Sequence, residues 1–408
     1  MNSSGEIRAF APEFRLALAC AGWPLSDRKR AEIQQLAIDE RINWAKFVQI
    51  IERNQFLPIA YRNLCEALPE YRADELRELK TKVVGLARHS LSQAAELVRL
   101  SDAAGRAGIE LLTLKGIALS VLAFGHVALR SPGDIDLFVD PEKVVEFERV
   151  VESLGYERYE PRAKLTPKRR RHYLKYYKHF AYSCEARSIL LEVHWRLFHN
   201  TRQEPDPKKL AKLSVPVGSS SVLTLPRNEL FLYLCVHGAV HGWPILKWLS
   251  DISAMLSLMS TDDLREIAAL ASERGLMPEV HAALMLVDSL LMVDRPRIDL
   301  PKPGPVTERI VAMSHRLLLA NDHCLDIQDL PRMEMFFYDL RIGPSWHYRG
   351  EDILRAFVYP NDWELVDLPD ALFPLYAAVR PVSWLVRHVR RMSRRTSAAG
   401  QTTPPLST

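Results

Sequence analysis

The sequence has few cysteines, and this scarcity excludes two kinds of stabilised fold. Five cysteines occur in 408 residues, scattered without paired spacing, at Cys20, Cys65, Cys184, Cys235 and Cys324. A disulfide framework or a structural zinc site needs cysteines at regular spacings, so neither is predicted. Because unpaired, scattered cysteines are typical of a reducing compartment, we expect a cytoplasmic protein.

Long apolar runs are also missing. No stretch of about eighteen consecutive apolar residues occurs, so the sequence predicts no membrane-spanning helix. The first residues, MNSSGEIRAF, lack a basic start followed by an apolar core, and we therefore expect no signal peptide. No repeat of fixed period stands out, which argues against a solenoid.

Charge of one sign is not in large excess. The formal net charge is +4, with 25% charged and 48% hydrophobic residues, which is the composition of a globular protein that is soluble in water. Such a mild charge gives no reason to expect a nucleic-acid partner. The length is enough for roughly two or three domains.

The most informative stretch runs from residue 109 to residue 140. Its first part, Ile109 to Leu114, is a short apolar run that predicts a buried strand, and an apolar helical pattern begins at Ile117. Lys115 and Gly116 lie at the junction between them. Free backbone N–H groups at a helix N-terminus attract phosphate, and a lysine adds positive charge there. We therefore predict that Lys115 and Gly116 bind phosphate.

Two aspartates follow a Ser-Pro-Gly turn in the second half of this stretch. Asp134 and Asp136 lie two apart in an apolar run, and the period of a strand places both carboxylates on one face. Two like charges on one face repel each other, which favours a cation between them. The alternative is that Asp134 caps a turn and Asp136 is an exposed residue of an edge strand.

A third carboxylate comes from an alternating run at residues 189 to 195, which is expected to pair with residues 180 to 184 as a hairpin. Glu192 and His194 share one face of this strand, so Glu192 is able to approach the aspartate pair from a neighbouring strand. His194 has two interpretations. It is either a half-buried ring bonded to a backbone carbonyl, which we favour, or a residue that lines the cleft.

Together these motifs resemble the DNA polymerase beta-like nucleotidyltransferases, in which a glycine begins a helix and apolar-Asp-apolar-Asp-apolar follows on the next strand. More narrowly, the chain is similar over roughly residues 30 to 260 to the bacterial family called uncharacterised nucleotidyltransferases. The motifs that carry the resemblance are Leu114-Lys115-Gly116, Arg130, Asp134-Ile-Asp136 and Leu191-Glu192-Val-His194-Trp195. Lys115-Gly116 departs from the Gly-Ser or Gly-Gly of the wider superfamily and matches the narrower family.

The resemblance implies a fold and a reaction. The fold would be an α/β (α+β) nucleotidyltransferase core with a small mixed sheet, flanked by N- and C-terminal helical regions. The reaction would transfer a nucleoside monophosphate from a nucleoside triphosphate to an acceptor, releasing pyrophosphate. The acceptor stays open among a small molecule, a sugar and a protein. A catalytically silent module that binds nucleotide or a partner on the same fold is the alternative.

The resemblance also implies roles for individual residues. Asp134, Asp136 and Glu192 would be catalytic and would hold Mg²⁺, with Mn²⁺ as an alternative. Lys115 and Gly116 would hold the triphosphate. Arg130 would add charge near the leaving pyrophosphate.

Helical periodicity on both sides of the core divides the chain into four parts. We expect a helical region at 1–107, the core at 108–224, a second helical region at 225–395 and a disordered tail at 396–408. In the second helical region, His237 and His241 lie four apart on one helical face. Zinc binding is one interpretation, although no intervening glutamate is present.

The resemblance gives the second interpretation of this motif. It would place His237, His241, Lys247, Trp248 and Asp251 along the cleft that faces the nucleotidyl site. A purely structural role for these side chains fits the pattern equally well.

Two basic segments complete the sequence. Residues 162–179 are rich in Lys and Arg and form either a solvated helix face or a basic wall that attracts phosphates. Residues 372–392 are apolar with arginines crowded at one end. This C-terminal helix either docks on the body of the protein or makes peripheral contact with an anionic membrane surface.

Overall fold

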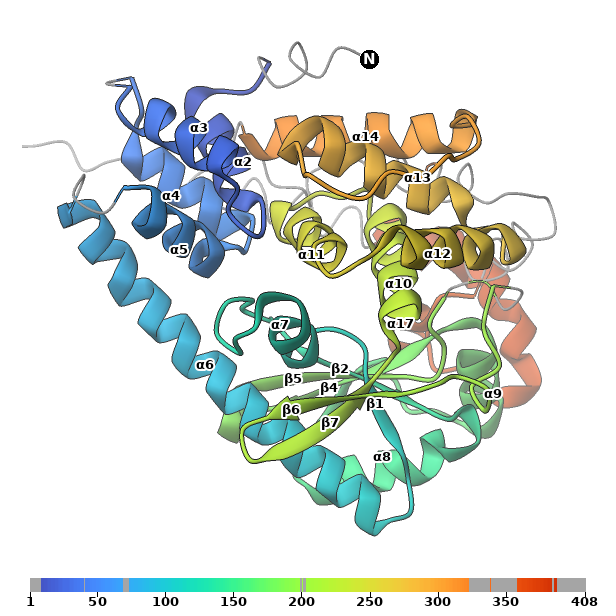
Figure 1. The fold of residues 1–408 in the computed structure, drawn as a ribbon. Helices are drawn as coiled ribbons and strands as arrows, with labels where there is room; N and C mark the ends of the chain where they lie inside the picture. The colour runs from blue at the N-terminus through green and yellow to red at the C-terminus, as the bar shows by residue number, and fades with distance from the viewer. Residues whose placement is uncertain are drawn as a thin grey trace, which may run out of the picture.

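A mixed sheet lies beneath a layer of helices in this computed structural model (Figure 1). The structure describes residues 9–39, 41–68, 73–198, 200, 203–322, 338, 358–383 and 385–386. Both chain ends of the described region contribute helices, and the sheet comes from the middle of the chain. This arrangement confirms the predicted α/β core with flanking helical regions.

The first helices pack together and lead into one long helix. They are α2 (Pro12–Ala21), α3 (Asp27–Ala37), α4 (Trp44–Arg53), α5 (Leu57–Ala67) and α6 (Ala73–Arg106). Ser26 and Asn43 cap α3 and α4, because each side chain accepts a hydrogen bond from the backbone N–H three residues further on. Helix α6 runs along the helical layer and then along the sheet, so it spans both (Figure 1).

Seven strands form the sheet in the order β3-β4-β5-β2-β1-β7-β6. They are β1 (Leu111–Thr113), β2 (Ile135–Val139), β3 (Glu157–Glu160), β4 (His179–Cys184), β5 (Ile189–His194), β6 (Leu213–Val217) and β7 (Ser220–Thr224). Strand β2 is antiparallel to β1 and parallel to β5, and β4 pairs with β5 as the expected hairpin. Neither β3 nor the β6–β7 hairpin was predicted from the sequence.

The segments between these strands cover both faces of the sheet. They include α7 (Ile117–Phe124), η1 (Pro141–Lys143), α8 (Val144–Ser153), α9 (Pro167–Tyr176) and η2 (Glu185–Arg187). Helix α7 lies between the sheet and the helical layer, whereas α8 lies on the opposite face (Figure 1). The loops around α7 therefore face the helices of the chain ends.

Two hydrophobic cores lie on the two faces of the sheet. The first combines the flanking helices with Leu112, Leu114 and Phe138, and the second contains Leu137 and Leu191. Phe138 and Asp136 lie two apart on β2, so the side chain of Asp136 points toward the helical layer. The alternation of the strand thus directs the acidic residues toward the helices rather than toward α8.

The second helical region consists of α10 (Arg227–Val240), α11 (Leu246–Leu256), α12 (Thr261–Glu273), α13 (Met277–Leu286), a π-helical turn η3 (Val287–Leu291) and α14 (Pro305–Asp322). A capping box of Ser260 and Asp263 begins α12. Across the described part of the chain, none of the helices has the length and apolar character needed to cross a bilayer.

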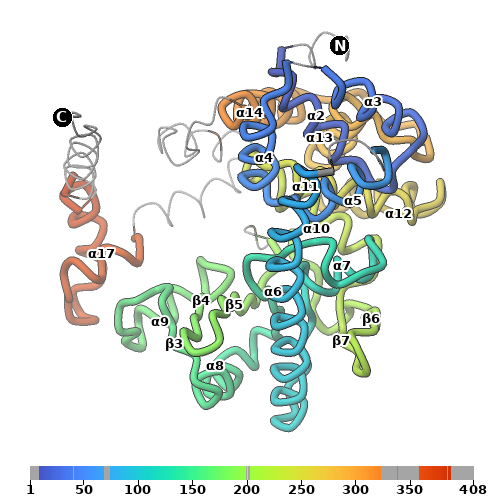
Figure 2. The backbone as a smooth tube through the Cα atoms, turned by 90° about the vertical axis from the view of Figure 1, so that its left-hand side faces the viewer, coloured from blue at the N-terminus to red at the C-terminus, as the bar shows by residue number. Residues whose placement is uncertain are grey.

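The last described segment packs on the basic helix α9 (Figure 2). It contains α17 (Pro360–Leu365) and η5 (Asp370–Leu375). Arg169 of α9 is buried and bonds Asp367 and the hydroxyl of Tyr376, while Arg170 pairs with Glu148. Part of the basic segment is therefore structural.

The described residues include only part of the predicted C-terminal helix. Residues 376–383 continue as a helix after η5. The arginines from residue 387 onward and the tail at 396–408 lie outside the described residues. Membrane contact through this helix stays a prediction.

Candidate active site

Three carboxylates meet on the face of the sheet that points toward the helices. Asp136 and Glu192 are register partners on the parallel strands β2 and β5, and Asp134 immediately precedes β2. One oxygen atom from each carboxylate lies within 4.8 Å of the others. The structure thus brings together the three acidic residues that the sequence selected.

Lys115 lies directly against this cluster. Its Nζ is 2.8 Å from Asp136 Oδ2 and 3.8 Å from Asp134 Oδ1, and its side chain is only 12% exposed. Burial opposes the charged form of the lysine, but the carboxylates of Asp136 and Asp134 outweigh it and raise the pKa of Lys115 above its ordinary value. The ammonium group therefore compensates two neighbouring negative charges.

A tight turn between β1 and α7 positions this lysine. Gly116 has φ +67° and ψ −127°, a backbone conformation that residues with a Cβ rarely adopt. The backbone N–H of Leu114 donates to the carbonyl of Asp136 at 3.1 Å, so the end of β1 stays attached to β2. This turn passes from strand to helix within a few residues and places Lys115 over Asp136.

The two aspartates have opposite electrostatic environments. The charge of Asp136 and then burial raise the pKa of Asp134 to about 6. Burial also opposes ionisation of Asp136, but the ammonium of Lys115 and the bonded imidazole of His194 hold its pKa well below its ordinary value. One carboxylate is therefore firmly ionised, and the other is close to protonation near neutral pH.

His194 connects two of the carboxylates. Its Nε2 lies 3.0 Å from Glu192 Oε2 and 3.4 Å from Asp136 Oδ1, and the ring is buried. The interpretation that we favoured from the sequence, a bond to a backbone carbonyl, is wrong: Glu192 lies two residues away on the same strand, and the pairing of β5 with β2 brings Asp136 beside the same nitrogen. His179 of β4 lies on the other side of Glu192, with its Nε2 4.0 Å from Oε1.

Arg130 pairs with a carboxylate of the second helical region. Its Nε donates to Asp251 Oδ1 at 2.7 Å, and the two side chains are 3% and 1% exposed. Its backbone N–H donates to Ser120 Oγ of α7. The residue therefore fixes the loop before Asp134 against α11.

Lys247 of α11 lies near the same group of charges. Its Nζ donates to Gln55 Oε1 at 2.6 Å, and the residue is buried. Burial, followed by the charge of Arg130, lowers the pKa of Lys247 to about 7. The Lys247 side chain is therefore only partly charged near neutral pH.

His237 of α10 and His241, which caps the C-terminal end of α10, pack against an aromatic ring. The rings of His237 and His241 lie 4.8 Å and 5.4 Å from that of Trp248, measured between centroids. Among the residues that the structure describes, the groups with metal-ligand geometry contain neither histidine. These contacts give the zinc interpretation no support.

Two residues near the site were not selected from the sequence. His179 shares the face of Glu192, and the alternation in His179-Phe-Ala-Tyr-Ser carried that information. Gln55 lies in the turn after α4, far upstream in the chain, and contacts Lys247 only through tertiary packing. Gln55 is exposed, and nothing in the local sequence distinguishes it from the other exposed glutamines.

Comparison with known proteins now adds to this geometry. A family model described as uncharacterised nucleotidyltransferase matches residues 40–292, which is more than half of the chain. This chain belongs to the uncharacterised nucleotidyltransferase family. The matched region includes the carboxylate cluster, the Lys115-Gly116 turn and the helices α4 to α6 and α10 to α13. This nucleotidyltransferase therefore has its candidate site, and part of each helical region, within the family's common region.

Other comparisons add less. A search of curated proteins gives no match to this nucleotidyltransferase. The chain is also similar to a solved structure, the solution structure of the antibiotic-resistance factor ANT(2'')-Ia, at 18% identity. That alignment covers 46% of this chain and 96% of the other, with a TM-score of 0.34. At this level of similarity we draw no conclusion about substrates from it.

Proposed function

We propose that this nucleotidyltransferase moves a nucleoside monophosphate from a nucleoside triphosphate to an acceptor, with Mg²⁺ at Asp134, Asp136 and Glu192, and releases pyrophosphate. The observation that supports the proposal is the convergence of three carboxylates within 4.8 Å beside a lysine at the start of a helix. Structural packing alone gives no reason to gather three acidic side chains on one half-buried face.

The donor atoms fit a hard divalent cation. Mg²⁺ takes one or two carboxylates together with phosphate oxygens and water, and this cluster offers such oxygens. Mn²⁺ also prefers carboxylate and water ligands, so the same cluster suits it as the alternative cation. A bound cation would neutralise the phosphates and align them for in-line attack.

Lys115 serves the phosphates in this proposal. In the structure its ammonium is held by Asp136 at 2.8 Å, the same carboxylate that would hold the cation. A cation bound to Asp136 would compete with the Lys115 ammonium for the negative charge of this carboxylate. The ammonium is then available to the triphosphate beside the N-terminus of α7.

Glu192 acts as a ligand or as an orienting group for the acceptor rather than as a strong base. Burial opposes its ionisation, but its bond to His194 and the neighbouring His179 lower the pKa of Glu192 to about 2. A carboxylate with so low a pKa is a weak proton acceptor near neutral pH. His194, which bonds Glu192 and also Asp136, holds the two carboxylates in a fixed relative position.

The test uses triphosphates labelled on the α-phosphate. The purified protein is incubated with Mg²⁺, each labelled triphosphate and a cell extract, and pyrophosphate release is followed in parallel. We expect label in an acceptor and an equal amount of pyrophosphate. Magnesium-dependent binding of triphosphate without pyrophosphate release would instead identify the alternative, a silent module that binds nucleotide.

A further inference from the structure

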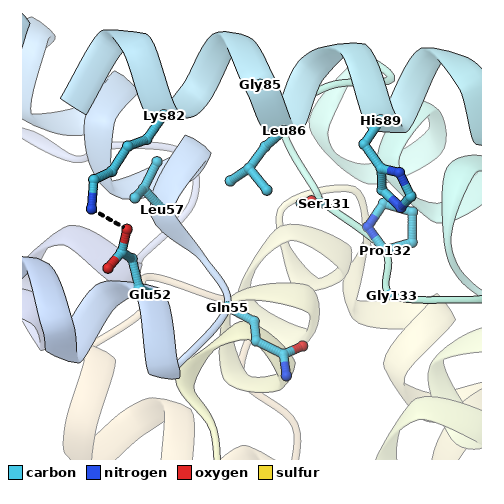
Figure 3. Close-up of a pocket in the computed structure, with 10 residues that line it drawn as sticks. All are labelled: Glu52, Gln55, Leu57, Lys82, Gly85, Leu86, His89, Ser131, Pro132 and Gly133. Carbon is cyan, nitrogen blue, oxygen red and sulfur yellow. Dashed lines mark hydrogen bonds and ion pairs between the residues drawn. The ribbon is translucent and has the colours of Figure 1, made fainter. Parts of the chain in front are cut away.

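A pocket of about 610 Å³ lies between the first helical region and the loop at residues 131–133. Figure 3 shows Leu57 and Leu86 in its middle, the Lys82–Glu52 pair at one end, and His89 and Pro132 at the other. Its volume is in the range of pockets that enclose small organic ligands. None of the roles proposed above uses this space.

The pocket borders the candidate active site at two places. Gly133, one of its lining residues, is bonded directly to Asp134. Gln55, another lining residue, accepts a hydrogen bond from Lys247 at 2.6 Å, and Lys247 lies within electrostatic reach of Asp134 and Lys115. A molecule in the pocket would therefore have one end near the carboxylates.

The wall that carries Gln55 is firmly built. Gln55 has φ +57°, a left-handed conformation that is uncommon for a residue with a Cβ. The preceding Asn54 is buried, and its side-chain oxygen accepts hydrogen bonds from Leu246 N and Asn321 Nδ2. Residues held in such conformations by their surroundings are concentrated at functional sites.

The lining also indicates the chemical class of the occupant. Its ten residues include one acidic and one basic side chain, Glu52 and Lys82, and these pair with each other at 2.6 Å. Among the described residues that line the pocket, the acidic and the basic side chain therefore compensate each other, which disfavours a charged ligand. The remaining walls are mainly leucine, proline and glycine, with Gln55, His89 and Ser131 as hydrogen-bonding groups. This lining fits a neutral molecule with a large apolar part.

A nucleoside fits these walls less well. Proteins commonly hold bases by stacking them on aromatic rings. Among the described residues of the chain, those that line the pocket include no Phe, Tyr or Trp. The phosphate-binding features, Lys115 and the N-terminus of α7, lie outside the lining as well.

We propose that this pocket binds the acceptor, and that the acceptor is a neutral, largely apolar small molecule whose hydroxyl reaches toward Gly133 and Asp134. This inference rests on the proposed function, since it names the substrate class of the same site. In the balanced reaction, the acceptor oxygen forms a bond to the α-phosphorus while the bond from that phosphorus to the pyrophosphate oxygen breaks. The hydroxyl proton passes to solvent.

Gly85 offers a clean way to fill the pocket. It lies within helix α6 and lines the pocket, and a Cβ built there meets nothing within 4 Å. Glycine within a helix is less favourable than alanine or leucine because its backbone loses more conformational freedom on folding, so a larger residue here favours the helix. Gly105 of the same helix also has open space around it but does not line the pocket, and it provides the matched control.

The first measurement uses Nile red, a neutral apolar dye, as the probe. We expect Gly85→Leu to weaken dye binding by about tenfold or more, because the leucine side chain occupies the volume that the dye needs. Gly105→Leu should bind the dye as the parent does. Equal dye binding by the parent and Gly85→Leu, or no binding by the parent, would overturn the assignment of the pocket.

The second measurement separates the acceptor from the nucleotide. Gly85→Leu should retain the parent's magnesium-dependent affinity for triphosphates. A loss of triphosphate affinity in this variant alone would show that the pocket holds the nucleoside, and the proposal would be wrong. If the parent itself does not bind triphosphate, the proposed function is contradicted. The dye measurement would still show whether the pocket binds a neutral apolar molecule.

The third measurement identifies the class of acceptor. A cell extract is divided into neutral apolar, cationic, anionic and protein fractions, and each is offered with α-labelled triphosphate. We expect the label in the neutral apolar fraction, with transfer reduced at least about tenfold in Gly85→Leu. Label in any of the other fractions, or undiminished transfer by Gly85→Leu, would refute the inference.

Discussion

Arg130 and Asp251 form a buried ion pair between the nucleotidyltransferase core and the second helical region. The guanidinium Nε lies 2.7 Å from Asp251 Oδ1, and both side chains are almost fully shielded from solvent. Arg130 lies four residues before Asp134, and Asp251 is in α11, the helix that also carries Lys247. The pair therefore fixes the approach to the carboxylates relative to the helical layer.

Removal of one partner should be costly. We expect Arg130→Met to lower the free energy of unfolding by about 3–5 kcal/mol, because Asp251 is left buried without a compensating charge. Urea denaturation measures this loss. The double variant Arg130→Met with Asp251→Leu should recover much of the stability, and it should still bind triphosphate if Arg130 is structural. A double variant that is stable but does not bind triphosphate would instead support the contact between Arg130 and the phosphates that the family resemblance implies.

Asp136 is the central residue of the metal proposal. Asp136→Asn should abolish magnesium-dependent triphosphate binding, because the amide removes the charged oxygen shared by the cation and Lys115. Calorimetric titration with and without Mg²⁺ measures the effect, and circular dichroism checks the fold. Asp140→Asn, just beyond the same strand, is the control. Asp140 caps η1, and an asparagine at this position can accept the same hydrogen bond. If both variants bind as the parent does, the metal lies elsewhere.

Lys115 has two roles that one variant can separate. Lys115→Ala should lower thermal stability without metal, because two carboxylates lose their compensating ammonium. Added Mg²⁺ should then raise the melting temperature more than it does in the parent. Triphosphate binding should weaken more than monophosphate binding, since the lysine is placed for the outer phosphates. If triphosphate and monophosphate binding weaken equally, only the structural role of Lys115 is supported.

Glu192 should matter for turnover more than for binding. We expect Glu192→Gln to keep its fold and most of its triphosphate affinity, because Asp134 and Asp136 still hold a cation. Turnover should fall by roughly a hundredfold or more, as for the loss of a group that orients the reacting atoms. Glu185→Gln, an exposed carboxylate at the turn of the same hairpin, should leave turnover unchanged. A Glu192→Gln protein that is merely less stable, with normal turnover per folded molecule, would assign Glu192 to an ion-pair role.

Lys247 makes stability depend on pH. Its pKa is about 7 in the folded protein and 10.5 as the ordinary value, so between these values the unfolded chain holds a proton that the folded protein lacks. Stability should therefore rise with pH from about 7 to about 10, and Lys247→Met should lack this contribution. The difference in unfolding free energy between parent and variant, measured at several pH values, isolates the lysine. A difference that does not change with pH would show that Lys247 keeps its ordinary pKa.

The sequence by itself determined the local features of this protein. The apolar run before Lys115, the glycine at the start of α7 and the alternation around Asp136 and Glu192 identified a strand, a turn and two acidic strand faces. These features depend on residues close together in the chain, whose periodicity specifies which side chains share a face. The family resemblance followed from the same motifs.

Only the tertiary structure decided which of these faces meet. The parallel register that sets Asp136 beside Glu192, and thereby gives His194 a second carboxylate partner, depends on strand pairing across a long stretch of chain. Periodicity specifies a face but not its neighbour, since the same alternation satisfies several strand orders. Arg130 shows the same limit: the family resemblance implies a role near the phosphates, but only the packing against α11 reveals its ion pair with Asp251. Gln55 reaches Lys247 for the same reason, because a contact between distant segments is determined by how whole helices pack and not by the residues around either partner.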